Sequence, residues 1–267
     1  MLTTHIRQNV SPDHLKKNVL GIVICDLNNH ISTVAARKCI DSIRNTDSKI
    51  QPLMMQATTP ETLDKHLSEF GLTKNDWTYP KIPNKRVIDI KTGLTITGYN
   101  AKDINKVIAC TASHLRVWSY CYMTDLPVVV LEHDALFTRK FDPFFVFDNY
   151  NKKNDFWEAG IVGLNDPRGA TRNADYYLRR LLDSRTENGI ELLPAPWADF
   201  DDKAPQGIAG NSAYMITPNA ALKLIQKTEE IGLWPNDALI CKQFFPFLKQ
   251  AYPFYTTLQG VPSTTKG

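Results

Sequence analysis

The chain has 267 residues, of which 43% are hydrophobic and 22% charged, proportions that are ordinary for a soluble globular protein. A formal net charge of +3 is too small to indicate nucleic-acid binding by itself. No apolar run approaches the roughly 18–20 residues of a membrane span, and the opening sequence MLTTHIRQNVSPDHLKK has no apolar signal core, so we expect a cytoplasmic protein without a transmembrane segment.

The N-terminal part contains two predicted strand–helix units. The first strand is a continuous apolar run that reaches Asp26, as in the buried strand of a parallel sheet. Ser32 or Thr33 can cap the first helix, whereas Thr59 caps the second, which stops at Gly71. This alternation favours an α/β sheet. The strands are predicted at 19–27 and 52–57, and the helices at 32–43 and 59–70.

Two irregular segments interrupt the alternation. Residues 73–105 lack a clear period and predict a long excursion with a short hairpin around 94–99, and residues 165–205 are again irregular. Loops of this length are often functional. The remaining chain predicts helices at 106–123, 217–230 and from 235 onward, and strands at 127–134, 157–164 and 210–217.

The strand PVVVLEHDALF, residues 127–137, runs from apolar residues into Glu132, His133 and Asp134. If the strand continues to Asp134, Glu132 and Asp134 share one face, because alternate residues of a strand do so. Two neighbouring carboxylates repel, and a Mg²⁺ or Mn²⁺ ion bound with a nucleotide diphosphate would remove that cost. The alternative is a solvated, charged strand end.

The five cysteines predict no disulfide framework, because their number is odd and no CxxC pair occurs. Most of them lie in apolar segments. We interpret them as buried, reduced thiols of a cytoplasmic protein, with catalytic or zinc-binding roles as the alternative. They are Cys25, Cys39, Cys110, Cys121 and Cys241.

Three segments resemble glycosyltransferase family 25, which includes lipopolysaccharide-type and collagen-modifying sugar transferases. ACTASHLRVW (109–118) and VVVLEHDALF (128–137) are similar to that family's Ser-His turn, helix and Leu-Glu-Asp-Asp-Ala strand end. GNSAYMITPNAALKLI (210–225) and PNDALI (235–240) look like its Gly-x-x-Ala-Tyr strand–helix unit and the Pro-x-Asp segment that follows. The resemblance covers roughly residues 105–240.

The resemblance implies a GT-A-like mixed sheet flanked by helices in a single domain, with residues 1–105 as the nucleotide-binding half and 106–267 as the metal and acceptor half. It also implies that Asp134 binds Mn²⁺ or Mg²⁺ and that Glu132 holds the metal shell or the donor ribose. His133 replaces the first Asp of the family's pair, and it either ligates the metal or points to the other face.

Asp237 is the leading candidate for a further metal ligand or for the general base that an inverting transfer needs. Its alternative role is to cap the helix that begins there, a role that Asn236 could also fill. Every histidine of the chain lies at or before His133, so a C-terminal ligand has to be an oxygen group. Asp201 and Asp202 are the second candidates.

Other residues are expected to contact the donor or the acceptor. Ser113 and His114 are donor-binding candidates, with a helix cap and a structural histidine as the alternatives. Gly210 and Asn211 can offer donors to the sugar, although a strand glycine also serves close packing. Further candidates are Asp26 and Arg37 for the donor, and Arg168, Arg172, Arg179 and Arg180 for an anionic acceptor or the diphosphate, unless these arginines form a solvated surface.

We therefore expect a metal-dependent glycosyltransferase, a hexosyl- or pentosyltransferase, that uses a nucleotide-sugar such as a UDP-sugar. The resemblance implies that the transfer inverts the anomeric centre. The acceptor is a glycan or lipid-linked saccharide, or a hydroxylated base in DNA. One alternative is a catalytically silent sugar-nucleotide-binding module with the same fold, suggested by His133. Another is a phosphohydrolase or nucleotidyltransferase, which does not explain the order of the three segments. The oligomeric state is open.

Overall fold

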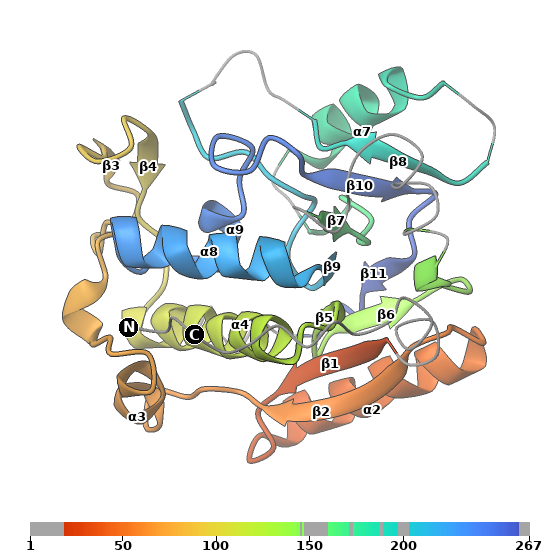
Figure 1. Cartoon of the computed structure of the whole chain (residues 1–267), viewed down its shortest axis with the longest axis horizontal. Helices are drawn as coiled ribbons and strands as arrows, with labels where there is room; N and C mark the ends of the chain where they lie inside the picture. The colour runs from red at the N-terminus through yellow and green to blue at the C-terminus, as the bar shows by residue number, and fades with distance from the viewer. Residues whose placement is uncertain are drawn as a thin grey trace.

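The computed structural model describes a mixed β-sheet whose order is β2-β1-β5-β9-β7-β10-β8 (Figure 1). The strands are β1 (Leu20–Cys25), β2 (Gln51–Gln56), β5 (Val128–Glu132), β7 (Ile161–Gly163), β8 (Glu191–Pro194), β9 (Ala213–Ile216) and β10 (Lys249–Tyr252). The structure describes residues 19–144, 146, 160–170, 173–186, 189–196 and 203–261. The predicted α/β class, with a mixed sheet flanked by helices, is confirmed.

Strand direction divides the sheet into two parts. β1 pairs in parallel with β2 and β5, so the carboxyl ends of these three strands meet at one edge. β9 runs antiparallel to β5 and β7, and its first residues therefore lie at that same edge. β10 is parallel to β7 and antiparallel to β8. The edge where β1 and β5 end is where ligands bind in open α/β sheets.

Helices cover both faces of the sheet, and the strand alternation shows which helix covers which face. Val128 and Val130 pack in the core that contains α4 (Ile104–Thr124) and α8 (Pro218–Ile231). Val129 and Leu131 point the other way, into the core that contains α2 (His30–Asn45). A central strand buried on both faces explains the uninterrupted VVVL run.

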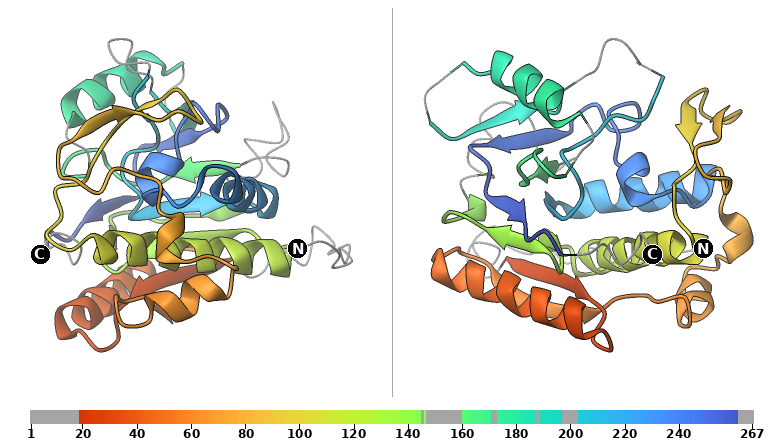
Figure 2. Two further views of the ribbon diagram at one scale, coloured as in Figure 1. Left: turned by 90° about the vertical axis from the view of Figure 1, so that its left-hand side faces the viewer. Right: turned by 180° about the vertical axis from the view of Figure 1, so that it is seen from behind.

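The remaining elements surround this core (Figure 2). They are α3 (Leu63–Ser68), the 3₁₀ turn η1 (Lys74–Asp76), the β3–β4 hairpin (Arg86–Ile88 and Thr95–Thr97), β6 (Ala135–Phe137) paired with β11 (Thr256–Leu258), α7 (Ala174–Asp183) and the single turn α9 (Asn236–Leu239). No helix in the described part of the chain has the length and apolar composition needed to cross a membrane.

Several predicted boundaries are confirmed by the structure. Thr217 caps α8, and its side chain accepts a hydrogen bond from the Ala220 N–H. A hairpin is present as predicted, with its second strand inside 94–99 and its first at Arg86–Ile88. The helix predicted to reach Phe70 ends at Ser68, and Gly71 has a positive φ in the turn that follows. All five cysteines are free, and four of them are buried, with Cys110 half-buried.

Other boundaries were predicted wrongly, because local capping signals compete. Asn29 caps α2 in place of Ser32 or Thr33, so the helix begins two residues earlier than predicted. Residues 60–62 form a turn, and α3 begins only at Leu63 with Thr62 at its N-cap. Residues 157–159 of the strand predicted at 157–164 lie outside the described residues.

Candidate functional site

The parallel pairing of β1 with β5 brings the predicted acids to one edge of the sheet. Ile24 pairs with Glu132, so Asp26, two residues after Ile24, lies beside the turn that follows Glu132. The Glu132 N–H donates to the Ser212 carbonyl at 2.8 Å, which brings the start of β9 to the same place. Asp26, Glu132 to Asp134 and Asn211 are therefore neighbours although they are far apart in sequence.

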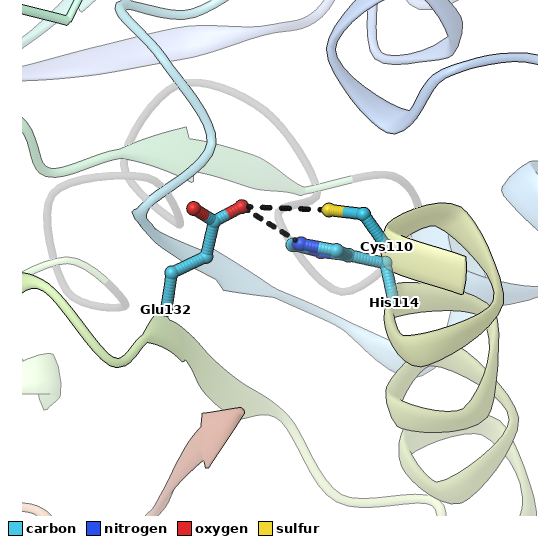
Figure 3. A group of neighbouring side chains, drawn as sticks. All are labelled: Cys110, His114 and Glu132. Carbon is cyan, nitrogen blue, oxygen red and sulfur yellow. Dashed lines mark hydrogen bonds and ion pairs between the residues drawn. The ribbon is translucent and has the colours of Figure 1, made fainter. Parts of the chain in front are cut away.

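Glu132 points toward helix α4. It continues the face of β5 that Val128 and Val130 begin, and that face packs on α4. Its Oε1 lies 3.2 Å from His114 Nε2 and 4.0 Å from Cys110 Sγ, and both of these side chains project from α4 toward the carboxylate (Figure 3). Burial raises the pKa of Glu132, but the hydrogen bond and charge of His114 outweigh it, so the net pKa is lowered.

A series of hydrogen bonds runs from Trp118 through Tyr214 to His114. Trp118 Nε1 donates to the Tyr214 hydroxyl at 2.7 Å, and that hydroxyl lies 2.8 Å from His114 Nδ1. An indole N–H only donates, so the Tyr214 hydroxyl accepts it, and the same hydroxyl also bonds His114 Nδ1. Because an ionised carboxylate only accepts, Nε2 carries a hydrogen and donates it to Glu132. We call Trp118, Tyr214 and His114, all fully buried, the closed side of the site.

Cys110, His114 and Glu132 hold one potential ligand atom each within 4.8 Å of the others, the spacing of a metal site. Two observations argue that the trio is a hydrogen-bonded group instead. First, His114 Nε2 donates its hydrogen to Glu132. Second, burial raises the pKa of the Cys110 thiol far above its ordinary value, and the charge of Glu132 raises it further. A metal at this position would have to displace both protons.

Asp134 lies on the other side of Glu132. β5 ends at Glu132 and residues 133–134 form a turn, so the condition for the two acids to share a strand face is not met. Burial, together with the charge of Glu132, raises the pKa of Asp134 to about 7. Its Oδ1 is buried and has no hydrogen-bond partner in the described part of the structure. A carboxylate in this position lacks a compensating cation or donor.

Two neighbours of Asp134 also have unpartnered polar atoms. His133 Nε2 and Asn211 Nδ2 are buried and form no hydrogen bond within the described residues. Burial lowers the pKa of His133, which favours the neutral imidazole, although the charges of Glu132 and Asp26 act in the opposite direction. Native proteins leave few buried polar atoms unpaired, so three at one edge of a sheet indicate a place for a polar ligand.

Asp237, on α9, lies close enough to Glu132 and Cys110 for its charge to interact with both. The Tyr99 hydroxyl donates a hydrogen bond to Asp237 Oδ2, and Tyr99 follows directly on the β3–β4 hairpin. Protein atoms crowd the carboxylate and raise its pKa, the Tyr99 hydrogen bond lowers it, and the charge of Glu132 raises it again. The residue nevertheless remains accessible to solvent. We call His133, Asp134, Asn211 and Asp237 the open side of the site.

The predicted helix caps near the site are wrong. Pro235 occupies the N-cap position of α9, so neither Asn236 nor Asp237 is the cap. Ser113 lies inside α4, not at a helix start, and the Cys110–His114 stretch is helical rather than a turn. The Ser113 hydroxyl accepts from the Thr58 N–H at 2.8 Å and donates to the Ala109 carbonyl at 2.9 Å, which ties the loop after β2 to α4.

The remaining predicted donor-binding residues have different surroundings. Asp26 Oδ1 accepts from the Asn28 N–H at 3.1 Å and from Gln56 Nε2 at 3.3 Å. Arg37 is exposed on α2 and makes no described contact with the open or closed side. Gly210 has φ +70°, and a Cβ there would lie 2.9 Å from Ala170 Cβ, so the backbone itself requires glycine.

The predicted anion-binding arginines are not brought together with the site by any described contact. Arg168 pairs with Asp166, and Arg179 and Arg180 lie on α7. Arg172, Asp201 and Asp202 lie outside the described residues. Sequence reasoning missed Tyr214 and Tyr99 as members of the site. Tyr214 stands in the quoted GNSAY segment, and its tyrosine was the one signal that could have pointed to it.

A comparison with family models identifies the family of this chain. The family model described as glycosyltransferase family 25 (LPS biosynthesis protein) matches residues 54–240. That range contains all members of the open and closed sides. No curated protein matches the chain. The crystal structure of mouse xyloside xylosyltransferase 1, apo form, matches with 10% sequence identity and a TM-score of 0.41, covering 86% of this chain and 83% of that one.

Proposed function

Because this chain belongs to glycosyltransferase family 25 and is a glycosyltransferase, we propose that it moves a sugar from a nucleotide-sugar, a UDP-sugar, to an acceptor hydroxyl with inversion. The observation that carries this proposal is the open side of the site. Asp134, Asn211 and His133 have buried polar atoms without partners at the edge where the parallel strands end. A diphosphate with its cation is the kind of ligand that such an edge receives.

The residues present fit a divalent cation. Asp134 Oδ1 is a buried oxygen without a partner, and its carboxyl has a pKa raised to about 7, a cost that a neighbouring cation removes. Asp134 would be the first ligand of Mn²⁺ or Mg²⁺, and Glu132 and His133 are the proposed further ligands, although the potential ligand atoms of these three residues do not all lie within 4.8 Å of one another. When bound, such an ion stabilises the charge that develops on the leaving nucleoside diphosphate. The closed side keeps the Glu132 carboxylate in one orientation toward the donor.

Asp237 is the proposed general base. It is accessible to solvent, its carboxylate is held by Tyr99, and its pKa is raised toward the range in which a carboxylate accepts a proton effectively. The acceptor hydroxyl gives its proton to Asp237 as its oxygen bonds to the anomeric carbon. The bond from that carbon to the diphosphate oxygen breaks with its electron pair on the diphosphate, which inverts the centre.

The acceptor is proposed to be a saccharide carried on a lipid or a protein, with a hydroxylated DNA base as the second candidate. Asp26, Ser113, His114, Gly210 and Asn211 remain proposed donor-binding residues, and Arg37 joins them only if the donor reaches the exposed face of α2. Binding to DNA would weaken steeply with salt, whereas binding to a neutral saccharide would not.

The test is release of nucleoside diphosphate from a panel of nucleotide-sugars, with Mn²⁺ or Mg²⁺, and NMR assignment of the anomeric configuration of the sugar product. We expect release from one UDP-sugar, with inversion, and none when the ion is chelated. Retention of configuration would remove Asp237 from the role of base. Tight nucleotide binding without any release would favour the catalytically silent module.

A further inference from the structure

The β3–β4 hairpin and the segment that leads into it carry an unusual group of exposed apolar side chains. Ile82, Ile88 and Ile90 are 59%, 67% and 98% exposed. The hairpin lies at the edge of the molecule in Figure 1 and in the right-hand view of Figure 2. Isolated exposed apolar residues are normal, but three isoleucines within nine residues on one such element call for an explanation. We call residues 81–99 the hairpin arm.

Alternation along the strands separates an inner face from an outer face of the arm. Ile96 is buried and Val87 packs against the same core, and these two residues are paired across the hairpin. Arg86 and Ile88 flank Val87 and are exposed, as expected for the opposite face of the strand. The inner face is thus anchored in the protein, and the outer isoleucine cannot turn inward without losing that anchor.

Backbone contacts fix the rest of the arm. A Cβ on Gly98 would overlap the Ile82 carbonyl, so the segment before β3 lies directly against Gly98. The Asn84 N–H donates to the Gly98 carbonyl at 3.0 Å, and the Gly98 N–H donates to the Lys85 carbonyl at 2.9 Å. In the turn, the Thr92 N–H donates to Asp89 at 2.9 Å. The exposed isoleucines therefore sit on an ordered, tied scaffold.

Positive charge accompanies these isoleucines. Lys81, Lys85, Arg86 and Lys91 are all exposed, and Asp89 is the single acid between positions 81 and 91. No ion pair within the described residues joins Lys81 or Lys85 to an acid. The arm therefore carries a local excess of three positive charges, equal to the formal net charge of the whole chain.

We propose that the hairpin arm docks on an anionic membrane surface. An element at the edge of the molecule that offers isoleucines together with lysines can insert the apolar side chains at the lipid–water boundary while the ammonium groups contact anionic headgroups. The phosphates of a nucleic acid would attract the lysines, but bases stack on aromatic side chains and not on aliphatic ones such as Ile88 and Ile90. The combination of both chemistries on one ordered arm favours the lipid surface.

The hairpin arm also contacts the candidate functional site. Tyr99, the last residue of the arm, donates its hydroxyl hydrogen to Asp237. If the proposed function is correct, a saccharide anchored in the bound membrane would be presented next to the proposed base. Docking itself does not depend on sugar transfer, and it is therefore measured by vesicle binding, independently of nucleotide binding.

The experiment measures sedimentation of the full chain with vesicles of equimolar phosphatidylcholine and phosphatidylglycerol, and with vesicles of phosphatidylcholine alone. The wild type is expected to bind the anionic vesicles more tightly and to be released by salt. Ile88→Ser with Ile90→Ser should weaken binding about 10-fold or more. Lys81→Gln with Lys85→Gln should weaken it about 5-fold for each charge removed.

Matched controls remove the same chemistry elsewhere. Met123→Ser removes an apolar side chain that is 66% exposed at the end of α4, and Lys38→Gln with Lys65→Gln removes two exposed charges. Both controls should bind vesicles as the wild type does. The proposal is overturned if the wild type does not bind anionic vesicles, or if the controls weaken binding as much as the arm variants. Binding to a DNA oligonucleotide in preference to vesicles, unaffected by the isoleucine changes, would also overturn it.

Discussion

The two sides of Glu132 differ in how completely their polar atoms are paired. On the closed side, Trp118, Tyr214 and His114 form a continuous series of hydrogen bonds that ends on the Glu132 carboxylate. On the open side, buried atoms of His133, Asp134 and Asn211 have no described partner. A complete network holds a side chain in place, whereas an incomplete one costs free energy until a ligand completes it. The Glu132 carboxylate is thus held by hydrogen bonds on the closed side and can be reached by a ligand on the open side.

The largest expected effect is on the open side, at Asp237. Asp237→Asn keeps the shape of the side chain and removes the base, so kcat should fall by about 10²–10⁴-fold while nucleotide affinity stays unchanged. Steady-state kinetics and nucleotide titration measure the two quantities. Asp41→Asn, which neutralises an exposed acid paired with Arg44 on α2, should retain full activity. A normal kcat in Asp237→Asn would exclude Asp237 as the base.

The closed side should respond in stability even without any ligand. Tyr214→Phe leaves Trp118 Nε1 and His114 Nδ1 buried without partners, which should lower the free energy of unfolding by about 1–3 kcal/mol. Chemical denaturation measures this loss. Tyr120→Phe, which removes a hydroxyl from a half-buried tyrosine of α4, the helix that carries His114 and Trp118, is the control. If both variants lose a similarly small free energy of unfolding, the closed side is not a connected hydrogen-bond network.

The smallest effect is a shift in pH dependence at Tyr99. The Tyr99 hydrogen bond lowers the pKa of Asp237, so Tyr99→Phe should raise that pKa further above its ordinary value. Because a base has to be ionised, the acidic limb of the kcat profile should move to higher pH, by about one unit or less. A limb that moves to lower pH, or that stays in place while kcat is otherwise normal, would contradict the assignment of Asp237.

The sequence predicted those parts of the molecule that depend on local pattern. The VVVL run predicted a buried central strand, and its polar end at Glu132 predicted a site at the carboxyl edge of the sheet. Thr217-Pro218 predicted the start of α8, and the GNSAY and PNDAL segments were part of the resemblance that predicted the family. Each of these signals lies within one element or within one family motif.

What could not be predicted depends on contacts between distant residues. β5 ends where its pairing with distant strands ends: Leu131 pairs with Ala213 of β9 and Glu132 with Ile24 of β1, and residues 133–134 then form a turn. Tyr214 contacts His114 across 100 residues of sequence, and Tyr99 contacts Asp237 across 138. No periodicity carries information about such pairs, so neither side of the site could be assembled from spacing alone.

The most direct measurement of the central claim is a thermal-unfolding titration of the wild type and Asp134→Asn with UDP and Mn²⁺, added separately and together. Without ligand and above pH 7, Asp134→Asn should unfold at a higher temperature than the wild type. The wild-type carboxylate has a pKa raised to about 7 by burial and by Glu132, so its charge opposes folding there, and Asn carries no charge.

With UDP and Mn²⁺ together, the order should reverse. The wild type should gain stability that depends on both ligands, because only the folded state binds them, and Asp134→Asn should gain little. We expect this reversal in the order of the two unfolding temperatures if Asp134 belongs to the donor site. Equal stabilisation of both proteins, or a loss of stability in unliganded Asp134→Asn, would show that Asp134 is an ordinary structural acid and that the open side is not the donor site.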